Sequence, residues 1–205
     1  MLYQEEKLYI FVKKKSSIMK NLFNLFLILL ILQSCAPSLT QYQTASTLGE
    51  NKTSYTLAVE ADIIHEEAIL SYRFIRGINE DTDFGIGFGI SNYSHIGVGI
   101  NVKKSLIKDK LALNIPIVAK GIGNTRFDFT PTLLYTFNPG NQKVKNTLSL
   151  QSISYYSDGE FETGAIYLSH NWELNLKKIF IYPEIGLEFY DSVYPKFGFA
   201  FTFKN

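Results

Sequence analysis

Cysteine is almost absent from this chain, which has one, Cys35, among its 205 residues. A single cysteine excludes an internal disulfide and a cluster of thiolate metal ligands. The three histidines, His65, His95 and His170, have no recurrent spacing and therefore do not predict a metal site. We expect the protein to have no metal and no cofactor.

The chain also lacks a hydrophobic run long enough for a membrane-spanning helix. The run Leu22–Leu32 has 11 residues, whereas a spanning helix needs about 20. It follows Met19-Lys20-Asn21 and ends shortly before Cys35, which is the layout of a secretory signal. A retained transmembrane anchor is the alternative. Two glutamates near the start of the chain are foreign to a basic start region, so translation could begin at Met19.

The residues Leu32-Gln33-Ser34-Cys35 resemble a bacterial lipoprotein signal. The resemblance implies cleavage before Cys35 and a lipid on the sulfur of this residue. The chain then divides into a leader and signal peptide (1–34), a lipidated linker rich in Ser, Thr and Gln (35–52) and one further domain (53–205).

Charge of either sign is sparse and balanced. The leader carries five of the 20 Lys and Arg residues and two of the 19 Asp and Glu residues, which leaves the mature chain with 15 basic and 17 acidic residues, a net charge of −2. No basic surplus points to nucleic acid or to an anionic membrane surface. We expect no nucleic-acid partner.

Residues with large apolar side chains alternate with smaller or polar residues along most of the remaining chain, which is the pattern of β-strands. Turn-forming stretches such as residues 138–141 and 157–159 separate the strands. Four prolines (116, 131, 183 and 195) each remove a ladder donor, so up to four strands are expected to be bulged or shortened. The ten expected strands, of which 147–156 and 161–174 are irregular, cover 55–63, 68–75, 84–90, 96–103, 111–118, 127–137, 147–156, 161–174, 179–189 and 193–203.

The less apolar face of these strands decides between a soluble barrel and a membrane barrel. A water-exposed surface is about 25–35% charged, but this face consists mainly of Gly, Ala, Ser, Thr and Asn. Small residues with a few opposite charges suit a narrow lumen. We therefore predict an all-β fold: a closed antiparallel up-and-down transmembrane β-barrel of about ten strands, with eight as the alternative, whose Phe, Ile and Leu side chains face lipid.

Two further segments resemble bacterial outer-membrane barrels. Residues Phe197–Phe203 are similar to the closing strand of this class, which ends on an aromatic residue, and Gln41–Leu48 is similar to the start of uncharacterised barrels that carry a lipoprotein signal. The resemblance implies a place in the cell outer membrane, anchored through Cys35. It implies outer-membrane lipid and the barrel-insertion and lipoprotein-sorting machineries as partners. The pattern carries no information on oligomeric state.

Charges on strands that become neighbours in a closed barrel predict an ion network in the lumen. The first and ninth strands carry acids, and the tenth strand between them carries Lys196. Paired charges would plug the pore and make the protein a rigid anchor or a narrow conduit, whereas unconnected charges in lumen water are the alternative. The predicted network comprises Glu60, Asp62, Arg73, Glu184, Glu188 and Lys196.

No residue is predicted to be catalytic. Ser169-His170 is reminiscent of outer-membrane lipid hydrolases, but neighbours on a strand point to opposite faces, beyond the reach that a nucleophile and its base need. The short outer loops argue against an adhesin, receptor or protease. We expect a lipid-anchored outer-membrane barrel with a structural or small-solute role. The alternatives are a periplasmic lipocalin-like lipoprotein that binds an apolar ligand and an outer-membrane lipid-modifying enzyme.

Overall fold

The computed structural model describes residues 42–62, 66–92, 96–121, 126–157 and 159–205. All regular elements within these ranges are β-strands, as the alternation predicts. They are β1 (Thr53–Asp62), β2 (Glu67–Asn79), β3 (Thr82–Ser91), β4 (Ile96–Ile107), β5 (Leu111–Gly121), β6 (Arg126–Phe129), β7 (Thr132–Thr136), β8 (Val144–Ser157), β9 (Glu160–Leu176), β10 (Ile179–Phe189) and β11 (Val193–Lys204).

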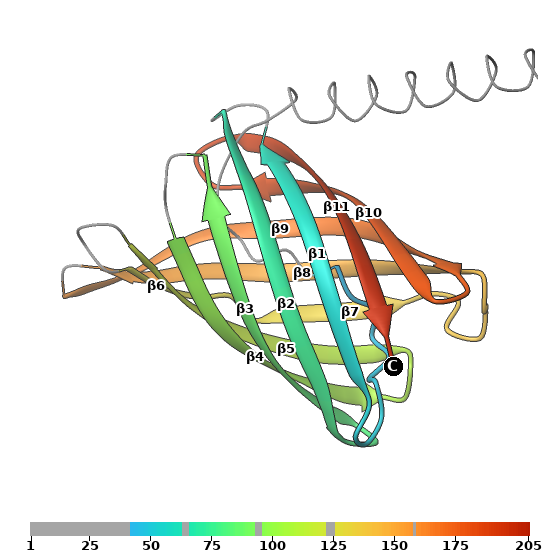
Figure 1. Ribbon diagram of the computed structural model, residues 1–205. Coiled ribbons are helices and arrows are strands. Elements are labelled where there is room, and N and C mark those ends of the chain that lie inside the picture. Colours follow the sequence, from blue (N-terminus) through green and yellow to red (C-terminus); the bar gives the residue numbers. More distant parts are fainter. Residues whose placement is uncertain (1–41, 63–65, 93–95, 122–125, 158) are drawn as a thin grey trace, which may run out of the picture. The chain divides into compact units, whose positions relative to one another are not determined.

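The strands form one closed antiparallel barrel (Figure 1). The ring closes where β1 pairs with β11, from Ser54 opposite Lys204 to Asp62 opposite Lys196. β6 and β7 together occupy a single place in the wall, because both pair with β5 on one side and with β8 on the other. The wall therefore has ten strands, and the prediction of a closed ten-stranded antiparallel barrel is confirmed.

Proline explains why one wall strand is divided into β6 and β7. Pro131 lies at the division and has no backbone N–H to donate to a neighbouring strand. Its carbonyl still accepts a hydrogen bond from the Ser152 amide at 3.0 Å, so β8 stays attached. Pro116, Pro183 and Pro195 lie inside β5, β10 and β11 without ending them, so a strand is broken at Pro131 alone among the four positions.

A β-bulge explains the irregular pattern that residues 161–174 show in the sequence. The register between β8 and β9 shifts between Ile153 and Ser154, whose partners are Ala165 and Thr163. Gly164 is thus the additional residue of β9. One extra residue reverses the faces of the side chains that follow.

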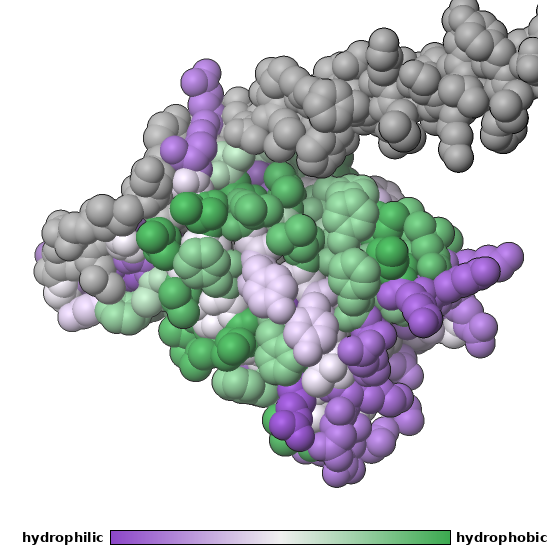
Figure 2. Space-filling view, viewed as in Figure 1, coloured by the Kyte–Doolittle hydropathy of each residue, from purple (hydrophilic) through white to green (hydrophobic). Residues whose placement is uncertain are grey.

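Apolar side chains cover the outside of the wall and polar side chains line the inside. Leu57, Phe88 and Ile100 are 45%, 45% and 47% exposed, although they lie in the middle of their strands. Thr132, Ser149 and Asn171, by contrast, are fully buried. Hydrophobic side chains spread over the strands in Figure 2, with hydrophilic ones gathered at the lower right and in a smaller group at the upper left. The predicted inside-out arrangement is correct.

The barrel has two ends, called here the hairpin end and the C-terminal end. At the hairpin end the chain connects β1 to β2, β3 to β4, β5 to β6, β8 to β9 and β10 to β11. At the C-terminal end it connects β2 to β3, β4 to β5, β7 to β8 and β9 to β10. β1 begins and β11 finishes at this second end, where the backbones of Thr53 and Asn205 exchange hydrogen bonds of 3.3 and 2.9 Å.

Candidate functional site: the lumen of the barrel

The predicted charge network falls on the lumen side of β1, β2, β10 and β11. Glu60, Arg73, Glu184 and Lys196 are all at least nine-tenths buried. Lys196 forms an ion pair with Glu188. Arg73 interacts electrostatically with Glu60 and Glu184, and Glu184 also accepts a hydrogen bond of 3.0 Å from the Tyr167 hydroxyl. The backbone of Asp62 lies opposite Lys196, whereas its side chain lies outside the described part of the structure.

Three further ion clusters line the lumen, and each has a buried acid at its centre. Asp83 pairs with Lys103 at 3.0 Å. Asp128 pairs with Lys120 and, at 2.6 Å, with Arg126. Glu173, whose side chain is 3% exposed, pairs with Lys145 at 3.3 Å and Lys204 at 2.6 Å, and it accepts a hydrogen bond from Tyr182. Ion pairs in the lumen therefore include more residues than the six that the sequence indicated.

The sequence contains a signal for some of these clusters. Asp83 lies directly opposite Lys103 in the pairing of β3 with β4, which strand alignment could have shown. Glu173 lies in a segment whose alternation is interrupted by the bulge at Gly164, so its face was ambiguous. Lys204 continues the alternation of Phe197–Phe203, which places it on the face opposite the phenylalanines, so the sequence contained a signal for this residue as well.

A segment that precedes the barrel in the sequence lies inside it. Residues Tyr42–Leu48, called here the lumenal segment, are buried at Tyr42, Gln43, Thr44 and Ala45. Figure 1 shows this segment as the blue trace within the ring of strands. Its backbone is held by the wall in four polar contacts: Asn171 Nδ2 to the Gln43 carbonyl (3.2 Å), the Ala45 amide to Thr136 Oγ1 (3.0 Å), Lys103 Nζ to the Ser46 carbonyl (2.7 Å) and the Leu48 amide to Asp83 Oδ1 (3.0 Å).

A tight turn sends the lumenal segment back into the barrel. Gly49 and Asn51 have φ angles of 86° and 60°, in the left-handed region that Gly and Asn adopt most readily. The Lys52 amide donates to the Gly49 carbonyl at 3.3 Å, and the Asn51 amide donates to the Gly77 carbonyl at 3.0 Å. The chain thus reverses at the C-terminal end, so that the lumenal segment runs antiparallel to β1.

Small residues of the wall make room for the lumenal segment. A Cβ at Gly198 would collide with the hydroxyl of Tyr42, which donates a hydrogen bond to the Val59 carbonyl at 3.2 Å. A Cβ at Gly77 would collide with the Gly49 carbonyl. Two small apolar clusters complete the packing: Tyr42 with Ala58, Tyr182 and Ala200, and Ala45 with Ala112 and Leu134.

A cavity of about 430 Å³ remains at the C-terminal end, and the lumenal segment forms part of its lining. We call it the vestibule. Its polar lining includes Lys52, Lys103, Lys145 and Lys204 together with Asp83 and Asp109. A second space, of about 10 Å³ beside Arg73 and Asn101, has room for roughly one water molecule.

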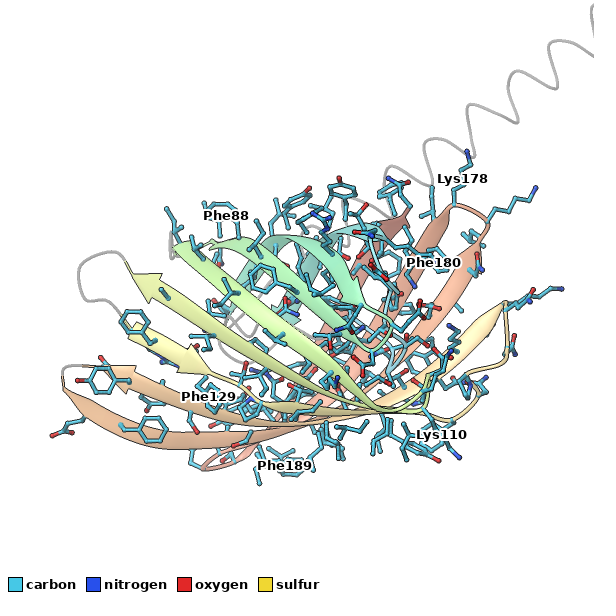
Figure 3. The ribbon with its side chains drawn as sticks, turned by 90° about the horizontal axis from the view of Figure 1, so that it is seen from below. Phe88, Lys110, Phe129, Lys178, Phe180 and Phe189 are labelled. Atoms are coloured by element: carbon cyan, nitrogen blue, oxygen red, sulfur yellow. The ribbon has the colours of Figure 1, made fainter. Side chains whose placement is uncertain are left out.

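The outer surface has the character of a lipid-facing belt with charged ends. Figure 3 shows Phe88, Phe129 and Phe189 on the wall, with Lys110 and Lys178 near its turns. The exposed apolar side chains include Leu70, Ile100, Leu150, Ile185 and Phe199, which lie on five different strands. No helix in the described ranges is long and apolar enough to cross a membrane.

The structure separates Ser169 from His170, as expected for neighbours on one strand. Ser169 is 2% exposed and hydrogen-bonds Ser149 in the lumen. The ring of His170 stacks on Trp172 with their centroids 4.4 Å apart. His65 and His95 lie outside the described residues. Within the described ranges no three His, Cys, Asp or Glu side chains gather as a metal site.

The glycines of residues 85–99 belong to paired strands. Gly85, Gly87 and Gly89 are in β3, and Gly97 and Gly99 are in β4, directly opposite Gly89 and Gly87. A Cβ at Gly85 would collide with the Asn101 amide oxygen. At Gly85 the role of the missing side chain is therefore close packing in the wall.

Comparison with known proteins gives one finding at the level of the fold. No family model and no curated protein matches the chain. Among solved structures, the chain is similar to one described as "De novo design of transmembrane beta-barrels", with 10% sequence identity, a TM-score of 0.40, and coverage of 76% of this chain and 97% of the other.

Proposed function

We propose that this protein is a non-conducting outer-membrane β-barrel that is anchored by a lipid on Cys35 and serves a structural role without catalysis. The observation that carries the proposal is the combination of an apolar exterior with a lumen filled by the chain itself. A ten-stranded barrel is already narrow. The lumenal segment and the four ion clusters occupy the space through which a solute would pass.

Burial of charge supports the structural role over a channel. Charged groups that line an open pore keep their water, whereas buried charges need partners. Glu173 and Asp128 are almost fully buried and paired with two cations each. Lys120 and Lys145 join neighbouring strands to these acids, and Lys204 of β11 reaches Glu173 of β9 across β10, so the pairs hold the wall together rather than line a path.

The two alternative functions fit the arrangement less well. A lipocalin-like cup for an apolar ligand needs apolar residues inside, but here the interior side chains are mainly Ser, Thr, Asn and charged groups. A lipid-active enzyme that uses His170 needs a serine within hydrogen-bond reach, whereas Ser169 faces the lumen and His170 stacks on Trp172.

Conductance in a planar lipid bilayer tests the proposal. The intact protein is expected to insert without a steady current, whereas a variant in which Tyr42–Leu48 is replaced by seven Gly and Ser residues should conduct. A Tyr55→Phe variant, changed only on the outer face, is the matched control and should stay silent. A steady current through the intact protein would contradict the closed lumen.

Detergent dependence tests the membrane assignment separately. A Cys35→Ser variant loses the lipidation site but keeps the apolar exterior, so it should still require detergent for extraction. A variant that dissolves in buffer as a monomer would show that the barrel does not sit in a bilayer.

A further inference from the structure

The direction of the lumenal segment has a consequence for the side of the membrane on which the lipid lies. We propose that the chain is threaded through its own barrel: it enters the lumen at the hairpin end and leaves at the C-terminal end. Cys35 and its lipid then lie across the membrane from the C-terminus. The inference rests on the proposed function for the bilayer and the lipid, and on the contacts of Tyr42–Leu48 for the direction.

Contacts at both ends of the lumenal segment fix its direction. Leu48 lies at the C-terminal end, where its amide donates to Asp83 Oδ1 at 3.0 Å and Asp83 is the second residue of β3. Tyr42 lies further along the lumen, where its hydroxyl donates to the carbonyl of Val59, three residues before β1 ends at Asp62. Followed toward lower residue numbers, the backbone therefore advances toward the hairpin end.

The length of chain between Tyr42 and Cys35 is sufficient for entry at the hairpin end. These residues are seven positions apart, and an extended chain spans at most about 3.6 Å per residue, or roughly 25 Å. β1 continues for three residues beyond Val59, about 10 Å of strand. The rim of the barrel at the hairpin end is within reach.

A return to the C-terminal end would require the chain to fold back on itself inside the lumen. The returning chain would also have to share the lumen with Gln43, Thr44 and Ala45, which are already buried there.

Single-cysteine labelling on cells tests the threading. Each variant reports the side of the membrane on which its thiol lies: Ser38→Cys for the chain before the lumenal segment, Ser192→Cys for the hairpin end and Lys108→Cys for the C-terminal end. A membrane-impermeant maleimide is added first to intact cells and then to permeabilised cells. The parent chain is the background control, since a lipid on the sulfur of Cys35 leaves no free thiol. The expected result is that Ser38→Cys reacts under the same condition as Ser192→Cys, and Lys108→Cys under the other.

Protease cleavage provides a second measurement in case the Ser38→Cys thiol is too shielded to react with the maleimide. A protease recognition site inserted between Pro37 and Ser38 should be cut on the same side as one inserted between Ser192 and Val193. Reaction or cleavage at Ser38 together with Lys108 would overturn the threading and leave the membrane barrel intact. Equal accessibility of Ser192→Cys and Lys108→Cys in intact cells would overturn the proposed function as well.

Discussion

At the scale of single residues, glycines and buried acids decide whether the lumen can be filled. Gly198 leaves the space that the Tyr42 ring and hydroxyl occupy, and Gly186 does the same for Tyr167. Both positions would appear from the sequence to be ordinary alternating glycines of a strand. Their necessity comes from aromatic side chains of other elements: Tyr42 of the lumenal segment and Tyr167 of the neighbouring strand β9.

Gly198→Ala is expected to destabilise the barrel by about 1–3 kcal/mol, because the new Cβ collides with Tyr42 and overpacking costs this much. The midpoint of heat unfolding in detergent measures the effect. Gly89→Ala is the matched control, since its Cβ would meet its neighbours at 3.7 Å, an ordinary contact. The double variant Tyr42→Ala/Gly198→Ala should lose less than the two single variants added together. Equal losses from Gly198→Ala and Gly89→Ala would contradict the packing.

Glu173→Gln is expected to lower the free energy of unfolding by about 1–3 kcal/mol. The change leaves Lys145 and Lys204 without their shared carboxylate, and the cost falls below that of a fully buried pair because both lysines keep some water. Asp81→Asn is the control: its exposed pair with Lys104 at 2.6 Å lowers the pKa of Asp81 but should contribute nothing measurable to stability. Denaturant unfolding in detergent micelles distinguishes the two variants.

At the scale of elements, local breaks in the strands match particular residues. Pro131 divides one wall strand into β6 and β7, and Gly164 adds a residue to β9. The turn at Gly49–Lys52 matters more for function, because it converts a polar segment before β1 into the filling of the lumen. A composition rich in Ser, Thr and Gln is compatible with a linker in water and with a chain among polar lumen side chains.

Hydrogen exchange of backbone amides tests the place of the lumenal segment. The amides of Ala45 and Leu48 donate to Thr136 and to Asp83 inside the barrel, so they should exchange as slowly as amides in the wall strands. The amide of Lys143, in the exposed connection between β7 and β8, should exchange fast and serves as the internal control. Fast exchange at Ala45 would show that the segment leaves the lumen readily.

At the scale of the whole molecule, the barrel is turned inside out relative to a soluble protein. Its exposed side chains are those that a soluble fold would bury, and its buried ones are mostly polar. Such an arrangement is stable only where the surrounding solvent is itself apolar.

Ile100→Lys is therefore expected to destabilise the folded protein in lipid vesicles by about 2–4 kcal/mol, the cost of a lysine near the middle of a bilayer. Ile100 is 47% exposed in the middle of β4, and Ile107, 54% exposed at the end of that strand, supplies the control. Ile107→Lys should cost about 0–1 kcal/mol, because a lysine near the interface keeps its water. Equilibrium unfolding in vesicles measures both. An unchanged or higher stability of Ile100→Lys would indicate that water surrounds the barrel.

The amino-acid sequence by itself determined the ten strands of the wall and the face that most of their side chains take, because alternation with a period of two is a local property. It also indicated Lys196 and the acids on neighbouring strands, since a closed ring makes the first and last strands adjacent. Tertiary structure alone decided what fills the lumen. The path of Tyr42–Leu48 depends on a reversal at Gly49 and on contacts with Val59, Thr136 and Asn171, which are far apart in the sequence. Such contacts produce no periodic pattern in the sequence of Tyr42–Leu48, so the sequence does not reveal them.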